Sequence, residues 1–347
     1  MHLYHMFYVY YSNMLLMCVC SQSWVSQYFE VGLEVHIAVE NINRREAYTK
    51  IREAADRLAP EFEFKIVDPL VGKYIPCPFL SARNGCDAEC LQIVADKVVL
   101  TPGVKIFCER MEPVVPGEKV ESGCALYSCS IKLPGSIERG LTVGHLFEDI
   151  GLECTVHCNS LSSSVSVGRC HTKITFVDLV DSLRKTTADL ALLDVFCQVE
   201  NTVVIDNVTY LLKLHHGFLN TKHCPRVAIL SDSGQLRYGQ VDSTLFTVSA
   251  LGLYNTLSIV APDNSWSRVN NPGDSGALVI SVPDPKVGNE LLVYGMVIGY
   301  FESDDGTQSK TVATRLGDIL NYVNKMSQFH DAPCNLESGY MSFVSFE

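Results

Sequence analysis

The chain has 347 residues and a net charge of −12, from 27 Lys and Arg against 39 Asp and Glu. This acidic balance excludes a typical nucleic-acid-binding protein, because phosphate contacts need clustered basic side chains. Hydrophobic residues make up 47% of the chain, which excludes a largely disordered protein. No run of apolar residues is long enough to span a membrane as a helix, and at roughly 150 residues per domain the length indicates about two domains.

Residues 1–30 form a leader segment. The apolar run at 14–20, followed by Ser21 and Ser23, is typical of a secretory signal, but the first basic residue is Arg44, so the usual basic start is missing. A signal peptide, a buried strand and a poorly packed leader all stay open. The fourteen cysteines are irregularly spaced and leave the compartment open, with the cytoplasm favoured over secretion.

Residues 31–112 mix two periodicities. Apolar residues alternate over 31–39 and 61–67, and between them 43–58 carries helix formers with apolar positions three and four apart. This order predicts a small α/β or α+β domain. Its role is unknown, because it contains no glycine-rich phosphate loop and no paired acids at a useful spacing. The segment 113–119, with two prolines and a glycine, is the predicted linker.

From about 119 to 330 the pattern changes to short apolar runs broken by Gly, Asn, Asp and Ser. Runs of this kind, repeated at roughly ten to fifteen residues, predict an antiparallel barrel or sandwich. Leu316, Ile319 and Leu320 recur at helical spacing and predict a closing helix, which leaves 331–347 as a C-terminal tail.

Two clusters of potential metal ligands occur in the sequence. Neither contains the paired Cys-x-x-Cys units that let two thiolates reach one zinc from a tight turn. We therefore expect no metal and no cofactor. The clusters are Cys77, Cys86 and Cys90, and Cys154, His157, Cys158, Cys170 and His171.

Three short motifs carry the chemistry. Gly273-Asp274-Ser275-Gly276 is preceded by Gly144-His145 and by Asp189, which leads into an apolar run. The order His, Asp, Ser and the separations of 44 and 86 residues resemble the chymotrypsin-like (trypsin-fold) serine proteases. The resemblance covers about 119–330. It implies a mainly β protein with a chymotrypsin-like double antiparallel β-barrel and a C-terminal helix, preceded here by the small α/β or α+β domain.

The resemblance implies a catalytic triad of His145, Asp189 and Ser275. A serine hydroxyl needs a base to take its proton, an imidazole supplies that basicity, and a buried carboxylate fixes the imidazole tautomer. The backbone N–H groups of Gly273 and Ser275 would form the oxyanion hole. The expected function is a serine endopeptidase that acts on protein or peptide substrates through an acyl-enzyme.

Several residues depart from the secreted members of the family. No Ile/Val-Val-Gly-Gly start precedes His145 at the usual distance, and Asn271-Pro272-Gly273 resembles the HtrA-like members, whose serine loop forms without zymogen cleavage. Ala277 replaces the customary second glycine and Leu146 replaces a common disulfide cysteine.

Specificity depends on the pocket base and the substrate strand. The resemblance assigns the base to Val269, or to Arg268 or Asn270 after a one-residue loop shift, and an apolar base disfavours cleavage after Lys or Arg. The substrate strand would align along Val297, Ile298, Gly299 and Tyr300. A catalytically inactive protease-like adaptor and an esterase both remain alternatives, and the sequence leaves the oligomeric state open.

Overall fold

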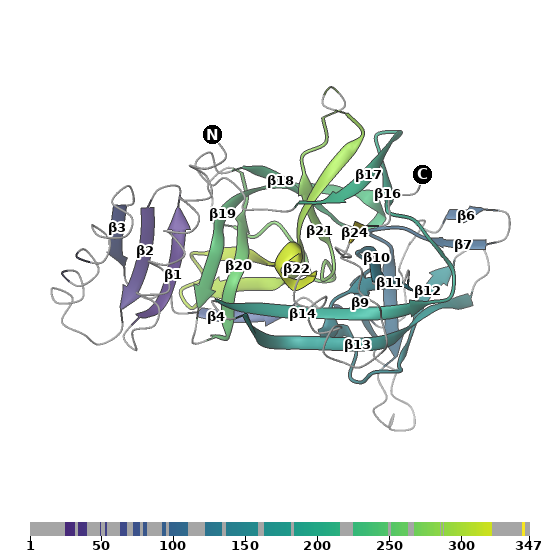
Figure 1. Ribbon diagram of the computed structural model, residues 1–347, viewed down its shortest axis with the longest axis horizontal. Coiled ribbons are helices and arrows are strands. Elements are labelled where there is room, and N and C mark those ends of the chain that lie inside the picture. The colour runs from purple at the N-terminus through teal and green to yellow at the C-terminus, as the bar shows by residue number, and fades with distance from the viewer. Residues whose placement is uncertain are drawn as a thin grey trace.

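The computed structural model describes most of the residues beyond 97 and short segments before it. Among the residues it describes, the fold is mainly β, as the sequence predicts, and the strands form barrel-like sheets (Figure 1). The described residues are 25–31, 34–39, 49, 53, 63–67, 72–76, 79–81, 92–94, 97–109, 122–133, 137–158, 163–181, 184–215, 225–248, 251–262, 267–284, 286, 288–320 and 342–343.

The first barrel is built from antiparallel strand pairs, and its two end strands, β9 and β10, follow each other directly along the chain. Its strands alternate short apolar runs with turns, and β9 continues into β10 without a break in the described chain. Within it, β12 pairs with β8. In order of pairing its strands are β10 (Cys129–Leu133), β11 (Ile137–Thr142), β14 (Arg184–Val195), β13 (Ser163–Asp181), β12 (Glu153–Cys158), β8 (Lys105–Glu109) and β9 (Ser122–Leu126).

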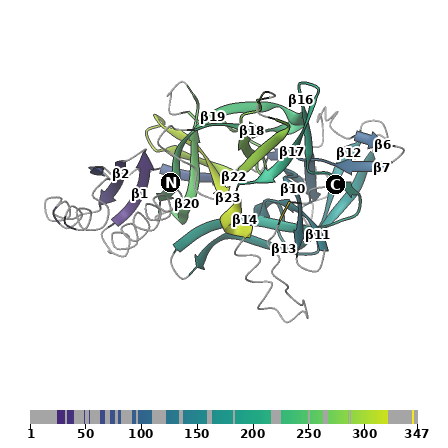
Figure 2. The same cartoon turned by 45° about the horizontal axis from the view of Figure 1, so that its top comes forward.

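The second barrel is a closed ring of antiparallel pairs. Each strand pairs with the next, and β21 returns to β18. Its strands in ring order are β18 (Arg226–Leu230), β19 (Leu236–Val248), β20 (Leu253–Val260), β23 (Ser309–Arg315), β22 (Glu290–Ser303) and β21 (Leu278–Ser281). The barrels pack together through β14, which contacts β20 and β23, and Figure 2 shows β14 beside these strands.

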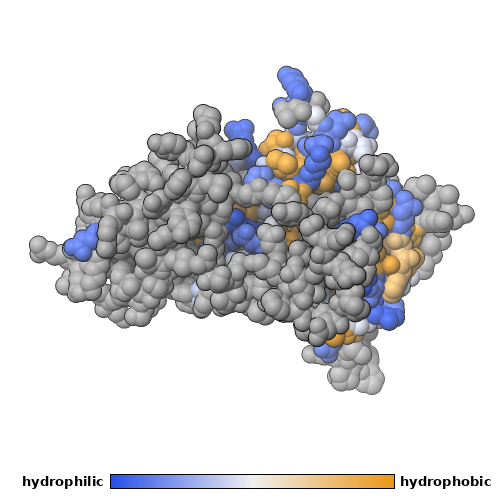
Figure 3. Space-filling view, viewed as in Figure 1, coloured by the Kyte–Doolittle hydropathy of each residue, from blue (hydrophilic) through white to orange (hydrophobic). Residues whose placement is uncertain are grey.

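Further strands extend the sheets. β17 pairs in parallel with β22, and β7 in parallel with β15. Figure 3 shows hydrophobic surface near the top of the molecule, where Figure 1 places β16 and β17. These strands are β16 (Thr202–Ile205), β17 (Val208–Leu214), β15 (Gln198–Val199), β7 (Lys97–Leu100), β6 (Gln92–Val94) and β24 (Ser342–Phe343), which pairs with β10.

The segment predicted as a separate α/β or α+β domain contributes strands to all three sheets. β2 (Glu34–Val39) pairs in parallel with β3 (Glu63–Val67), and the intervening Thr49 and Glu53 are helical, as a β-α-β order requires. β1 (Val25–Val31) joins this unit to β19. β8 lies before the predicted linker at 113–119, yet it is a strand of the first barrel. The linker itself, residues 1–24 of the predicted leader at 1–30 and most of the tail at 331–347 lie outside the described residues, and residues 25–30 of the leader belong to β1.

The apolar positions of the strands fill the two barrels. Leu141, Leu190 and Leu193 are fully buried in the first barrel, and Val279, Val297 and Ala313 in the second. After β23, residues 316–320 are helical, and Leu316, Ile319 and Leu320 are buried, so the predicted closing helix is present in the described part. None of the helices in the described part of the chain is long and apolar enough to cross a membrane.

Candidate active site

The predicted histidine and aspartate come from neighbouring elements of the first barrel. β11 ends at Thr142 and is followed by the 3₁₀ turn η2 (Gly144–Leu146), which carries His145. β11 pairs with β14 in a register that sets Thr142 opposite Ala191, two residues after Asp189. The strand pairing therefore brings the turn directly over the aspartate.

Asp189 holds His145 at two points. One carboxylate oxygen accepts the His145 backbone N–H at 2.9 Å, and the other bonds to Nδ1 of the ring. Asp189 is fully buried, so its charge has no access to bulk water. A carboxylate in this position favours the tautomer with its proton on Nδ1, in which Nε2 acts as an acceptor.

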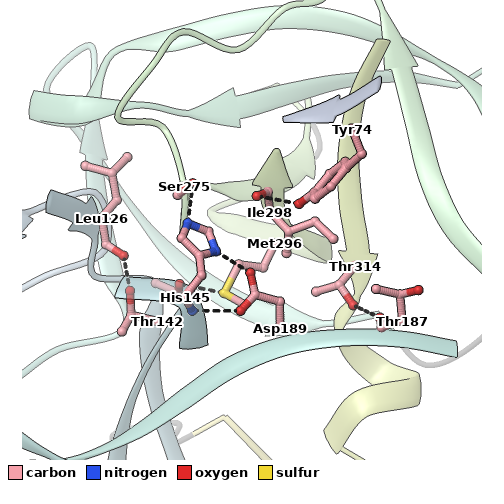
Figure 4. Close-up of polar contacts among 11 residues, drawn as sticks. Tyr74, Leu126, Thr142, His145, Thr187, Asp189, Ser275, Met296, Ile298 and Thr314 are labelled. Carbon is pink, nitrogen blue, oxygen red and sulfur yellow. Dashed lines mark hydrogen bonds and ion pairs between the residues drawn. The ribbon is translucent and has the colours of Figure 1, made fainter. Parts of the chain in front are cut away.

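Ser275 comes from the second barrel and lies on the side of the imidazole opposite Asp189. Its Oγ lies 3.1 Å from Nε2 of His145, so the three side chains form one hydrogen-bonded chain across the two barrels (Figure 4). Leu126 of β9 donates its backbone N–H to the Ser275 carbonyl at 2.7 Å. This bond fixes the serine segment against the first barrel.

The loop around the serine depends on glycine. Gly273 and Gly276 have φ values of 92° and 89°, a region that side chains disfavour. A Cβ on Gly276 would lie 2.1 Å from the carbonyl oxygen of Leu126. Among the residues that the structure describes, the N–H groups of Gly273 and Ser275 donate to no acceptor. Both donors are therefore available to a bound oxygen atom.

Asp274 is turned away from this surface and anchors the loop. It is buried, and its carboxylate accepts the Ser231 hydroxyl at 2.5 Å and the Asn271 N–H at 2.6 Å. Nε of Arg237 lies 3.7 Å from the same carboxylate. Sequence reasoning missed Ser231 and Arg237, because neither stands in a motif and both lie about forty residues from Asp274 in the chain.

The residues assigned to specificity lie along two segments. Val269 is half-buried, and its N–H, like that of Asn270, donates to Oγ1 of Thr311. The guanidinium of Arg268 stacks on the ring of Tyr300 at 3.8 Å. Ile298, Gly299 and Tyr300 lie in β22, two to four residues beyond Met296, whose side chain Figure 4 shows beside Asp189.

The remaining candidates lie elsewhere. His171 is exposed and forms an ion pair with Asp194, and His215 packs its ring against Tyr294. Cys154 and Cys170 are buried thiols, and burial raises their pKa values to about 12 and about 11. Among the described residues, no group of three or more His, Cys, Asp and Glu side chains is placed to hold a metal ion.

Comparisons with known proteins give structural likeness only. No protein-family profile and no curated protein matches the chain. Protease A from Thermobifida fusca is 15% identical, with a TM-score of 0.42, over 65% of this chain and 96% of its own. A chymotrypsin from Cellulomonas bogoriensis is 13% identical with a TM-score of 0.40, over 65% and 96%. The Nocardiopsis protease is 14% identical with a TM-score of 0.39, over 64% and 95%.

Proposed function

We propose that the protein is a serine endopeptidase that hydrolyses peptide bonds through an acyl-enzyme. The observation that carries the proposal is the chain of contacts in which His145 bonds to the buried Asp189 on one side and lies 3.1 Å from Ser275 Oγ on the other. A nucleophile, a base within hydrogen-bond reach and a group that orients the base are the parts this chemistry needs.

Each residue has a defined step. His145 takes the hydroxyl proton as Ser275 Oγ attacks the carbonyl carbon, and later gives that proton to the leaving amine. Asp189 stabilises the imidazolium formed between these transfers. A water molecule then attacks the acyl-enzyme with His145 again as the base. The N–H groups of Gly273 and Ser275 stabilise the oxyanion, and losing one such donor in other enzymes costs about 3 kcal/mol.

The hydrogen bonds to Asp274 support an enzyme whose serine loop forms without a proteolytic cut that creates a new N-terminus. Ser231 and Asn271 already satisfy the buried carboxylate, which in the secreted proteases that this sequence resembles pairs with the newly formed amino group. This agrees with the resemblance of the loop to HtrA-like members. Val269 at the pocket base would favour an apolar or small side chain before the cleaved bond.

A second candidate is a protease-like adaptor without activity. The observation that favours it is the exposure of Ser275, which is 0% in this structure. A serine side chain with no solvent-exposed surface cannot be reached by a substrate in this conformation. The two candidates therefore differ in one property, which is whether Ser275 reacts once it is accessible.

A peptide-library digest tests the proposal. The full chain is incubated with the library, and cleavage products are identified by mass spectrometry. We expect cleavage that disappears in Ser275→Ala and in His145→Ala, with both variants retaining the wild-type unfolding transition. Cleavage that survives in Ser275→Ala would contradict the assignment of the nucleophile.

A further inference from the structure

A strand from the N-terminal part of the chain lies on the edge of β22. β4 (Gly72–Pro76) pairs with β22 in antiparallel orientation, with Ile75 opposite Tyr300 and Pro76 opposite Gly299. The other edge of β22 is taken by β23. β4 therefore covers the edge that the proposed function assigns to the substrate, and an antiparallel strand is the arrangement in which a peptide joins a sheet.

The side chain of Tyr74 adds a contact closer to the candidate active site. Its hydroxyl donates to the carbonyl oxygen of Ile298 at 2.9 Å (Figure 4). A Cβ built on Gly299 would lie 2.7 Å from the same hydroxyl. Because Gly299 has no side chain, the Tyr74 ring fits beside it. The carbonyl oxygen of Ile298, a backbone acceptor at the proposed substrate edge, is therefore already hydrogen-bonded to Tyr74.

The chain continues onto the opposite side of the serine. β5 (Phe79–Ser81) pairs antiparallel with β9, with Phe79 opposite Cys124. β9 has β8 on its other edge, so β5 completes its pairing. Segment 72–81 therefore adds an antiparallel strand to each barrel, first to β22 and then to β9.

Both pairings end close to Ser275. Leu126, two residues after Cys124, donates its N–H to the Ser275 carbonyl. Val297, two residues before Gly299, accepts the N–H of Gly276 at 2.9 Å. Two residues separate Pro76 from Phe79, so these Cα atoms are at most about 11 Å apart. The two strand ends therefore lie on either side of the serine and within one short span, and Ser275 has 0% exposure.

We propose that β4 and β5 act as an internal peptide that occupies the substrate cleft in the orientation of a substrate and slows the protease until they are displaced. The inference rests on the proposed function of the same site. The ligand class of the cleft is accordingly an extended peptide that pairs with β22 before the cleaved bond and with β9 after it.

The sequence of the segment indicates why it blocks the site instead of being cut. The central peptide bond between Pro76 and Phe79 joins Cys77 to Pro78. The nitrogen of Pro78 carries no hydrogen and is closed into a ring, which also restricts the residue before it. The ring obstructs attack on the preceding carbonyl and limits the backbone geometries in which the bond can approach a serine, so cleavage of this bond is slow.

Tyr74→Ala tests the proposal on the full chain. Hydrogen exchange of the backbone amides at 299–303 is measured together with the rate at which a fluorophosphonate labels Ser275. We expect faster exchange and about ten-fold faster labelling, and a synthetic peptide of residues 72–81 should slow labelling of the variant. Tyr238→Ala is the matched control, because Tyr238 in β19 is 53% exposed, and it should change neither quantity.

The outcomes separate the two proposals. Unchanged exchange and labelling in a folded Tyr74→Ala would overturn the internal-peptide proposal while leaving the enzyme in place. Faster exchange without labelling in any form would support occupancy of the cleft and contradict the proposed function. If Tyr74→Ala does not fold, Tyr74→Phe removes only the hydroxyl, and a two- to five-fold rise in labelling is expected. An unchanged rate in a folded Tyr74→Phe would count against the proposal.

Discussion

Asp274 illustrates how one side chain shapes a candidate active site without touching a reacting atom. Its neighbour Ser275 carries the nucleophile, whereas its own carboxylate is buried and directed toward Ser231. Burying a carboxylate without hydrogen bonds costs free energy, so the loop favours the conformation in which Ser231 and Asn271 donate to Asp274. That conformation also leaves the Gly273 and Ser275 amides without acceptors among the described residues.

Ser231→Ala should therefore weaken both the fold and the reaction. It removes the 2.5 Å hydrogen bond to a charged group, which is worth about 1.5–3 kcal/mol. We expect a free energy of unfolding lower by that amount in urea titration, and a fall in kcat that exceeds any change in KM. Thr172→Ala, at an exposed position in β13, serves as the control. A loss of stability with unchanged kcat would show that the bond does not position the oxyanion donors.

Gly144 controls how closely the histidine turn approaches Asp189. A Cβ at this position would lie 2.3 Å from the carbonyl oxygen of Ile174 and 3.0 Å from Oδ1 of Asp189. Gly144→Ala should lower the free energy of unfolding by about 1–3 kcal/mol and reduce activity at least ten-fold, because the turn must move away from the carboxylate. Gly317→Ala, whose added Cβ meets only an oxygen 3.5 Å away, should leave both quantities close to wild type. Equal effects of the two substitutions would contradict this account.

At the scale of elements, β12 and β13 each carry a cysteine whose thiol is buried in the first barrel and therefore resists ionisation. Burial raises the pKa of Cys154 to about 12 and that of Cys170 to about 11, above the ordinary value of 9. In the unfolded chain these thiols ionise near pH 9, whereas in the folded chain they keep their protons. Their contribution to stability is therefore complete below pH 9 and is lost as the pH rises toward 11–12.

This direction of the pH dependence of stability can be tested by denaturant unfolding between pH 7 and pH 10.5 under reducing conditions. The free energy of unfolding should fall above pH 9, and it should fall less steeply in Cys154→Val. Val is chosen because it fills similar volume without a titrating group. Identical pH slopes for the wild type and Cys154→Val would show that the thiol does not contribute.

The strand pairings on both sides of the serine lead to a further prediction. Pro78→Ala replaces the ring nitrogen with an ordinary amide, so the internal peptide should become a substrate of its own site. Intact-mass measurement should find a fragment of residues 1–77, and the double variant with Ser275→Ala should remain whole. A stable Pro78→Ala chain that labels fully with a fluorophosphonate would contradict the proposal that β4 and β5 occupy the cleft as a substrate does.

At the scale of the whole molecule, local patterns predict the mainly β fold and the closing helix, and the resemblance of three motifs to serine proteases predicts the three residues that meet at the barrel interface. His145, Asp189 and Ser275 stand in short motifs whose order along the chain is informative. The contacts that the sequence could not predict join distant residues with ordinary surroundings. Tyr74 bonds to Ile298 across 224 positions, and Ser231 meets Asp274 across 43, so only the folded topology brings them together.

The separate N-terminal domain was predicted from periodicity, which identifies strands but not their partners. The alternation at 61–67 corresponds to β3, yet nothing in residues 72–81 distinguishes a strand of an independent unit from one that pairs with β22 and β9. Pairing between distant strands depends on backbone hydrogen bonds that any side chain permits. The proposed role of β4 and β5 in limiting access to the cleft therefore rests on the register of their pairing with β22 and β9 and not on a sequence motif.

One measurement tests the central claim most directly. Tyr74→Ala is treated with a fluorophosphonate, and the modified residue is located by peptide mapping. The account predicts a single adduct on Ser275 that is abolished in the double variants with His145→Ala or Asp189→Asn, while the Lys213→Ala control variant, altered at an exposed ion pair, labels as fast as its parent. No adduct on Ser275, or an adduct that forms equally fast without His145, would contradict it.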